Sequence, residues 1–468
     1  MADDAYDEIV IGAGLSGLAA GVRLAQAGRR VVVLERHYLW GGLNSFFKKA
    51  GRRFDVGLHA LTNFARRGER GRPLNRVLRQ LRLSRDELRL GEQRESWIDF
   101  PDARLRFSND FEDLRAAVHD AFPSEGPGFD RLAAAVAETD YGIEEPLVPA
   151  RSVLAEYLRD PLLVDMLLHP ILWYGSPTPH DLEWPSFVVL WKSLYEEGLA
   201  RPAGGVRPLL DALRRRLSAE GGELRLRAGV RRVLRDADGV VGVRLDDGTE
   251  LRAPRVLSSA GWVETMRLCG GELAREHDER EAGRLSFVET TTLLAKPPAD
   301  LGFEPTIVFY NRAPRTIYEV PEEEIDPRSG IVCCPDNYRD QEPAPESPFR
   351  VTVLADHARW CALGEEDYRA AKARAWERAL EAVTAFAPDV RPWASFVDVF
   401  TPRTIEHYTG HVNGAVYGAP VKRRDARTPV PGLYLTGTDQ GYLGIVGAVS
   451  SGIDVANRYV LLGSLTSR

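Results

Sequence analysis

The stretch DEIVIGAGLSGLAA at residues 7–20 decides the fold of this 468-residue chain. Residues 7–11 contain a short apolar run that ends in glycines, and residues 15–27 are rich in alanine, as is typical of a helix. RVVVL at residues 30–34 is a second apolar run and is typical of a buried strand. A strand, a helix and a strand in this order have one common arrangement, a parallel strand pair with a right-handed crossover. We therefore predict an α/β fold that begins with a Rossmann-like layer.

Three glycines between the first strand and the helix fit the pattern G-x-G-x-x-G: Gly12, Gly14 and Gly17. Gly12 allows a tight turn, Gly14 lets the backbone approach a pyrophosphate with no Cβ in the way, and Gly17 lets helix and strand pack closely. The helix that starts at Leu15 and Ser16 offers free N–H groups and a partial positive charge to phosphates. The pattern and its position predict a dinucleotide-binding loop.

Glu35 ends the second strand about 20 residues after the glycines, where a carboxylate can accept hydrogen bonds from ribose hydroxyls. An isolated glycine pattern can mark an ordinary turn, and a lone Glu35 can be a surface charge. The strand, glycines, helix and acidic residue within one unit favour a dinucleotide cofactor instead. The unit by itself does not separate NAD from FAD.

Composition excludes several classes of protein. Dividing the length by about 150 residues per domain predicts two or three domains. A formal net charge of -7 disfavours a partner such as duplex DNA, which proteins grip with many basic residues. With no run of about 18 apolar residues and no leader-like N-terminus, we expect no membrane-spanning or secreted segment.

The four cysteines show neither a zinc-binding spacing nor a dense disulfide framework: Cys269, Cys333, Cys334 and Cys361. The sequence therefore predicts no metal site and a location in a reducing cytoplasm.

Two glycine-containing segments near the ends of the chain extend the pattern. Gly41, Gly42, Leu43 and Asn44 follow Glu35 and Arg36, and GRRFDVGLH comes next at residues 51–59. PGLYLTGTD at residues 431–439 is followed by GIVGA at residues 444–448. Together these segments resemble the phytoene desaturase, carotenoid isomerase and retinol saturase group, which belongs with the flavin amine oxidases.

The resemblance implies that the cofactor is FAD and assigns roles to several residues. Glu35 would bind the adenosine ribose, the turn at Gly41 and Gly42 would approach the pyrophosphate, and the backbone of Val230 would contact adenine. Asp439 would meet the phosphate or ribityl chain, although a turn or helix-cap role is the alternative. The cofactor-binding residues implied are Gly12, Gly14, Leu15, Ser16, Gly17, Glu35, Arg36, Gly41, Gly42, Leu43, Asn44, Val230, Gly437, Asp439, Gly444, Ile445, Val446 and Gly447.

One residue departs from the family pattern. Leu43 follows the glycine pair where many relatives place an arginine, which removes a cation that could neutralise the pyrophosphate. Another basic group can substitute for it, so FAD remains the expected cofactor.

The same resemblance and the changing periodicity predict a Rossmann-like FAD-binding domain with an inserted mixed α+β substrate domain. The FAD-binding domain would comprise residues 1–70, 204–285 and 401–468. The substrate domain would comprise residues 71–203 and 286–400.

No local signature of an activated nucleophile is present, as expected where a flavin carries the redox step. His59 is the candidate for catalysis or substrate contact, with a structural role as the alternative. Aromatic residues in the inserted region could line an apolar substrate chamber or form an ordinary helical core: Trp173, Tyr174, Trp184, Phe187, Trp191 and Tyr195.

The leading functional hypothesis is FAD-dependent hydride transfer at carbon–carbon bonds of an apolar, polyene or isoprenoid substrate, in desaturation, saturation or isomerisation. Oxidation of a C–N bond is the first alternative. Many amine oxidases carry a lysine beside the flavin, whereas here residues 288–295 contain none and Lys296 only follows them. A non-catalytic flavin-binding protein is the second alternative. We expect an undetermined electron donor or acceptor, no nucleic-acid partner and, as a further expectation, peripheral contact with a membrane.

Overall fold

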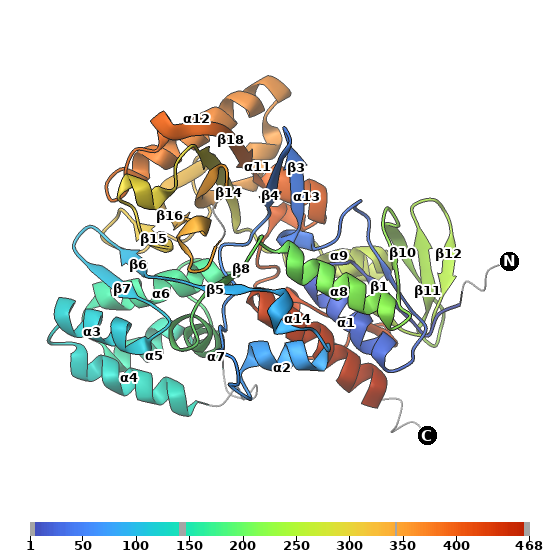
Figure 1. Ribbon diagram of the computed structural model, residues 1–468. Helices are drawn as coiled ribbons and strands as arrows, with labels where there is room; N and C mark the ends of the chain where they lie inside the picture. Colours follow the sequence, from blue (N-terminus) through green and yellow to red (C-terminus); the bar gives the residue numbers. More distant parts are fainter. Residues whose placement is uncertain (1–4, 140–146, 342–343, 463–468) are drawn as a thin grey trace.

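The computed structural model describes residues 5–139, 147–341 and 344–462. In Figure 1 the parallel sheet with its helices lies on one side, and a larger sheet with a helical layer lies on the other. The C-terminal helix α14 (Gly444–Val455) runs beside the N-terminal helix α1 (Leu15–Gln26), so the two ends of the chain form one body.

The first body is built on a five-stranded sheet in the order β19-β13-β1-β2-β9. Every neighbouring pair runs parallel. The strands are largely buried because helices cover one face of the sheet and a three-stranded antiparallel sheet with one helix covers the other. The predicted α/β fold with a Rossmann-like start is therefore confirmed. The strands are Glu8–Ile11 (β1), Val31–Leu34 (β2), Glu223–Arg225 (β9), Val256–Ser258 (β13) and Leu433–Leu435 (β19).

Helix α1 packs between α14 and α8 (Arg207–Ala219). Gly452 is required where α1 and α14 cross, because a Cβ there would collide with the carbonyl oxygen of Ser16. A three-stranded antiparallel sheet adjoins this body. The further elements here are α2 (Pro73–Gln80), β10 (Val230–Arg235), β11 (Val240–Leu245), β12 (Glu250–Arg252), α9 (Trp262–Cys269) and α10 (Gly271–Glu276).

The second body contains a seven-stranded sheet in the order β18-β14-β17-β16-β15-β6-β7. All its pairs are antiparallel except β15 with β6. Helix α12 (Glu365–Val383) packs against one face of this sheet. The strands are Ser96–Asp99 (β6), Arg104–Phe107 (β7), Ser286–Leu294 (β14), Ile307–Asn311 (β15), Ile325–Cys333 (β16), Ser347–Ala355 (β17) and Ala394–Phe400 (β18).

A helical layer completes the second body and shares one apolar core with its sheet. Its helices are Phe111–Ala121 (α3), Gly126–Glu138 (α4), Ala150–Tyr157 (α5), Pro161–Gly175 (α6) and Trp184–Trp191 (α7). One short hairpin, one short strand pair and two short helices complete the described elements. They are Phe46–Lys49 (β3) with Arg52–Asp55 (β4), Leu90–Glu92 (β5) with Ala200–Pro202 (β8), His357–Ala362 (α11) and Pro402–Thr409 (α13).

The strands of the parallel sheet fall within the segments predicted for the FAD-binding domain, and those of the seven-stranded sheet fall within residues 71–203 and 286–400. The domain boundaries themselves remain predictions.

One helix in the described part of the chain, residues 444–462, is long and apolar enough to cross a membrane by length and mean hydropathy. Half of the apolar stretch of this helix is buried inside the protein, and the helix packs against α1. Core helices of globular proteins have the same properties, so this helix belongs to the fold of the first body.

Trp191 gives a test of the helical core. It is fully buried and contacts the rings of Phe111, Phe129, Phe187 and Tyr195. We expect Trp191→Ala to lower the free energy of unfolding by about 3–5 kcal/mol, because the cavity left behind can close only in part. Urea unfolding of parent and variant measures the difference. Trp393→Ala is the control, since Trp393 is 37% exposed and its loss should cost far less. A small loss at Trp191 would contradict this packing role.

Candidate active site

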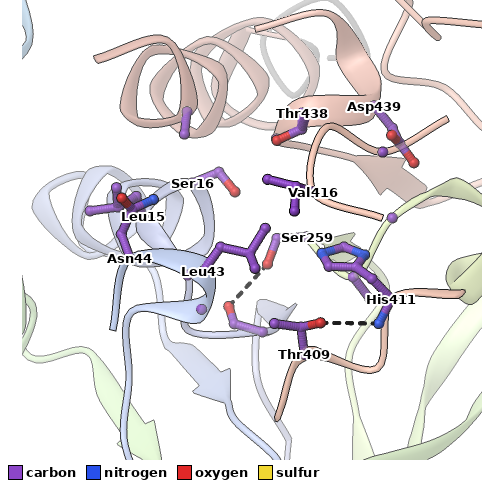
Figure 2. A pocket seen from close by; sticks show the side chains of 18 of the residues that line it. Leu15, Ser16, Leu43, Asn44, Ser259, Thr409, His411, Val416, Thr438 and Asp439 are labelled. Atoms are coloured by element: carbon purple, nitrogen blue, oxygen red, sulfur yellow. Dashed lines mark hydrogen bonds between the residues drawn. The ribbon is translucent and has the colours of Figure 1, made fainter. Parts of the chain in front are cut away.

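A cavity of about 430 Å³ lies where the two ends of the chain meet. Figure 2 shows Leu15, Ser16, Leu43 and Asn44 of the N-terminal unit facing Thr438 and Asp439 of the C-terminal segment across it. The following predicted residues line the cavity: Gly12, Gly14, Leu15, Ser16, Glu35, Arg36, Gly41, Gly42, Leu43, Asn44, Val230, Gly437, Asp439, Gly444 and Ile445. Their roles in holding the cofactor remain predictions.

Each glycine of the loop has the local geometry that its predicted role needs. Gly12 has φ of +91°, a left-handed conformation that favours glycine, and a Cβ there would lie 2.5 Å from Oγ of Ser259. A Cβ on Gly14 would have nothing within 4 Å, so this residue faces open space in the cavity. A Cβ on Gly17 would collide with the carbonyl oxygen of Gly12. Gly17 therefore serves packing and does not line the wall.

The carboxylate of Glu35 is fixed by two backbone donors. The N–H of Ala13 donates to Oε2 at 2.8 Å, and the N–H of His37 donates to Oε1 at 2.9 Å. Each oxygen keeps a second lone pair, so the side chain can still accept from ribose hydroxyls. The same contacts join the end of β2 to the glycine loop.

The N-terminus of α14 also faces the cavity. Its first residue, Gly444, has φ of +71°, and no side chain caps the first turn. Uncapped N–H groups and the helix dipole favour negative charge at this point. Of the other predicted residues in this helix, Ile445 lines the cavity, whereas Val446 packs in the core and Gly447 lies against Tyr442.

Asp439 lines the cavity, but both of its carboxylate oxygens already accept hydrogen bonds from backbone N–H groups. The N–H of Trp262 donates to Oδ2 at 2.6 Å, and the N–H of Ala419 donates to Oδ1 at 2.7 Å. The side chain is 5% exposed. These contacts favour the turn or helix-cap alternative, because Trp262 is the first residue of α9 and Asp439 accepts from its N–H.

The sequence did not point to several other residues of the wall. Ser259 donates to the carbonyl of Ile11 at 2.9 Å. His411 pairs with Glu264 at 3.6 Å; burial opposes its charge, but Glu264 raises the pKa of His411 overall. Arg267 also lines the cavity and, together with the predicted Arg36, is a candidate for the cation that is missing where this chain has Leu43. No local motif marks these residues, because they converge from separate segments.

A second cavity, of about 100 Å³, continues from the first towards the seven-stranded sheet. The two cavities share Gly57, His59, Trp173 and Tyr417 among their walls. Most of the second wall is apolar or aromatic, and the residues that line only this cavity include Phe47, Val56, Phe287, Ile331, Phe400 and Ile405.

The sequence left two alternatives for the aromatic residues of the inserted region, and the structure places most of them in a helical core. Trp173 and Tyr174 line cavities, but Phe187, Trp191 and Tyr195 pack in the helical core, and Trp184 packs against it. Apolar periodicity looks the same for a core and for a chamber, so the sequence could not separate the two.

His59 lies where the two cavities meet and is joined to a buried polar cluster. Its Nε2 is 3.0 Å from Oε2 of Glu289 and 3.0 Å from Oγ1 of Thr352. Burial lowers the pKa of His59, so the imidazole is neutral at pH 7. Burial alone would raise the pKa of Glu289, but Arg350 and His59 bring it down to about 2. An ionised Glu289 only accepts, which assigns the proton to Nε2 and leaves Nδ1 unprotonated.

The backbone beside His59 is clamped by buried donors. Arg201 donates to the carbonyl of Leu58 at 2.7 Å and pairs with Asp55 at 2.8 Å. Arg350 also donates to the carbonyl of Leu58, and its guanidinium pairs with Glu289 at 2.5 Å. These contacts hold His59 rigidly at the junction.

The lowered pKa of Glu289 predicts how the stability of the protein depends on pH. Its pKa is about 2 in the folded protein and 4.5 as an ordinary glutamate, so its pairing stabilises the fold above pH 4.5 and is lost as the pH falls towards 2. The contribution is about 3 kcal/mol. Glu289→Gln should be less stable at pH 7, because Arg350 is left buried without its anion. This deficit should shrink by about 3 kcal/mol at low pH, as measured by urea unfolding of both proteins from pH 7 to pH 2.5. Parallel pH curves would contradict the assignment.

The geometry defines a class of protein: one with a Rossmann-like cavity suited to a dinucleotide cofactor and a second, largely apolar cavity beside it. Comparison with protein families agrees. An NAD(P)-binding Rossmann-like domain matches residues 10–81, and the flavin containing amine oxidoreductase family matches residues 184–459, more than half of the chain. The chain belongs to the flavin containing amine oxidoreductase family and is an FAD-dependent oxidoreductase.

Individual relatives cover nearly the whole chain. It is 25% identical to a chloroplastic prolycopene isomerase of Arabidopsis thaliana, over 97% of this chain and 82% of that protein. It is 26% identical to an all-trans-retinol 13,14-reductase of Danio rerio, over 96% of this chain and 84% of that protein. An oxidoreductase from Methanosarcina mazei shares the fold with a TM-score of 0.69 at 18% identity, covering 96% of this chain and 100% of that one. The predicted family resemblance is thereby confirmed.

Proposed function

We propose that this enzyme transfers hydride at a carbon–carbon bond of an apolar substrate, a polyene or isoprenoid, in desaturation, saturation or isomerisation. FAD, when bound, supplies the hydride chemistry itself. The residues of the second cavity would bind the substrate, orient it and exclude water.

One observation carries the proposal: the carboxylates that line the second cavity all have a cationic partner. Asp55 pairs with Arg201 at 2.8 Å, and Glu289 pairs with Arg350 at 2.5 Å. Asp398 pairs with Lys49 at 2.5 Å. The remaining wall is largely aromatic and aliphatic, and it favours an apolar ligand by about 25 cal/mol per Å² of apolar surface removed from water. The named activities of the two curated relatives, on prolycopene and on retinol, support the same substrate class.

The same charges argue against C–N oxidation. A substrate ammonium group needs an anion that is free to pair with it, and the cavity carboxylates are already neutralised. Lys296 is exposed and packs over the ring of Trp393 at 4.2 Å. It lines neither of the two cavities.

The proposal is tested with the FAD-loaded protein under anaerobic conditions. The oxidised protein is mixed with a panel of acyclic carotenoids and retinol in detergent, and the photoreduced protein is mixed with the same panel. We expect the flavin absorbance to change with at least one polyene and to stay constant with putrescine. Flavin reduction by the amine alone would favour C–N oxidation. Because isomerisation leaves the redox state of the flavin unchanged, the polyenes are also analysed for isomerised product. A light-reducible flavin that responds to neither class, with no isomerised polyene formed, would favour the non-catalytic alternative.

We further propose that the enzyme works in the cytoplasm and exchanges electrons with oxygen, a quinone or a loosely bound carrier. Because its substrate would be insoluble in water, we propose peripheral contact with a membrane. Co-flotation of the protein with lipid vesicles tests this contact, and a protein that stays in the soluble fraction would contradict it.

A further inference from the structure

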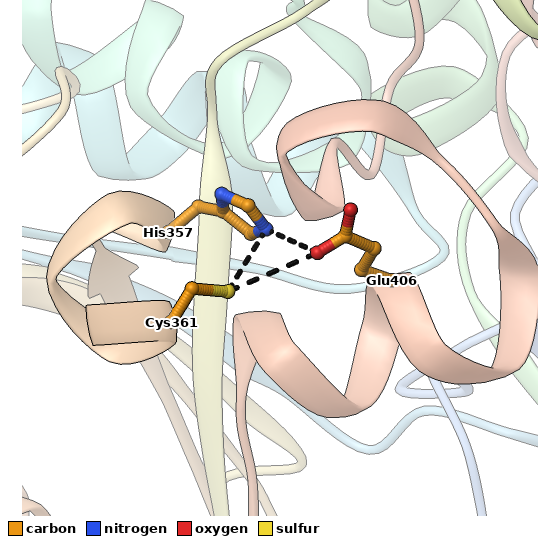
Figure 3. Close-up of side chains that lie close together, drawn as sticks. All are labelled: His357, Cys361 and Glu406. Atoms are coloured by element: carbon orange, nitrogen blue, oxygen red, sulfur yellow. Dashed lines mark hydrogen bonds and ion pairs between the residues drawn. The ribbon is translucent and has the colours of Figure 1, made fainter. Parts of the chain in front are cut away.

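A cluster of three metal-ligating side chains lies apart from both cavities, between α11 and α13. Figure 3 shows His357 and Cys361 on one helix pointing at Glu406 on the other. His357 and Cys361 are four residues apart, so they lie on the same face of α11. Nε2 of His357 is 2.7 Å from Oε2 of Glu406, and Sγ of Cys361 is 3.3 Å from Nε2 and 3.8 Å from Oε2.

The arrangement is not that of an activated nucleophile. In a catalytic triad the imidazole bridges its partners, with the nucleophile at one ring nitrogen and the acid at the other. Here the thiol and the carboxylate both approach Nε2. Burial and the neighbouring Glu406 also raise the pKa of Cys361, whereas a reactive cysteine needs a lowered one. Three donor atoms instead converge on one point.

We propose that His357, Cys361 and Glu406 form a binding site for Zn²⁺, with a fourth position open to water. One imidazole nitrogen, one sulfur and one carboxylate oxygen are the ligands that zinc prefers. Ligands held tetrahedrally at about 2.0–2.3 Å from one ion lie roughly 3.3–3.6 Å apart. The donor atoms of this cluster all lie within 4.8 Å of one another, so modest side-chain rotation brings them to that spacing.

The proposed metal site lies between two helices that are connected to the walls of the cavities. Glu406 belongs to α13, whose Ile405 lines the second cavity, and Thr409 at its end lines the first. α11 directly follows β17, which carries Thr352 and Arg350 beside His59. A bound ion would tie these two helices together and fix one wall of the active site. Sequence spacing could not reveal the site, because Glu406 is 45 residues from Cys361.

The test uses the FAD-loaded protein after dialysis against a chelator. Zn²⁺ is titrated in competition with a chromophoric chelator, and Co²⁺ is added separately because its thiolate bond gives a near-ultraviolet charge-transfer band. Cys361 is the exposed member of the four cysteines, so its reaction with a thiol reagent reports directly on the site. We expect one Zn²⁺ per chain, a cobalt–thiolate band and, with Zn²⁺ present, at least about ten-fold slower thiol modification. Zinc should also raise the melting temperature.

Variants separate this site from adventitious binding. Cys361→Ser and His357→Gln should each weaken Zn²⁺ binding by more than about ten-fold, the loss that removal of even an outer-shell partner can cause. His407→Gln is the matched control, because His407 is exposed and adjoins Glu406 without joining the cluster. Flavin absorbance and melting of the zinc-free variants should match the parent, which shows that they are folded. Absence of zinc uptake, uptake that both variants retain, or a cobalt spectrum without a thiolate band would each overturn the proposal.

Discussion

Gly14→Val is expected to give a folded protein that no longer retains FAD. A Cβ on Gly14 would have nothing within 4 Å, so the substitution should leave the surrounding structure intact. The branched side chain would project into the cavity at the N-terminus of α1, where a pyrophosphate approaches the backbone. We expect FAD affinity to fall at least about 100-fold, or roughly 3 kcal/mol.

The measurement combines flavin absorbance of the purified variant with titration of added FAD, and circular dichroism shows whether the fold survives. Gly17→Ala is a matched contrast, because its added Cβ would collide with the carbonyl oxygen of Gly12. That variant should lose stability as well as cofactor. A folded Gly14→Val protein with full FAD occupancy would remove the glycine loop from the cofactor site.

The sequence could predict the part of the fold and site that depends on local backbone geometry. The glycine loop, the parallel β1–β2 pair and Glu35 come from one continuous unit, and each residue type has a steric or electrostatic reason to be there. The contribution of the C-terminal segment to the cofactor site could be predicted only from the family resemblance. Its helix meets the glycine loop by tertiary packing, which no local pattern shows.

The rest of the site depends on contacts between distant strands. Glu289 on β14 and Arg350 on β17 are diagonal neighbours in the sheet, 61 residues apart in the chain, and neither lies in a motif. The sequence shows that α6 and α7 are rich in aromatic residues. It does not show which of these side chains line a cavity and which pack in a core. Trp173 lines a cavity, whereas Trp191 is packed in the helical core. Which face of a helix meets a cavity is decided by packing, so composition alone could not assign it.

His59→Ala is expected to keep its yellow cofactor and to lose most of its rate of flavin reduction by substrate. FAD should stay bound because the glycine loop, Glu35 and the start of α14 lie elsewhere along the first cavity. His59 lies at the junction of the cavities as a neutral imidazole, with Nε2 oriented by Glu289 and Nδ1 unprotonated. An unprotonated nitrogen at that point can accept a proton from the substrate. Loss of such a group typically slows a reaction by about 10²–10⁴-fold.

The rate is measured by rapid anaerobic mixing of FAD-loaded protein with the polyene that turns over, and His119→Ala, at a surface ion pair on α3, is the control. The pH profile separates a base from a packing residue. Because the pKa of His59 is lowered by burial, its neutral form persists below pH 6.5, and the parent rate should stay constant through that range before it falls. Glu289→Gln should shift the profile, since it removes the carboxylate that fixes the tautomer, while FAD stays bound. If His59→Ala reduces flavin as fast as the parent at every pH, the imidazole only anchors Glu289 and Thr352, and the flavin with its apolar cavity suffices for the step.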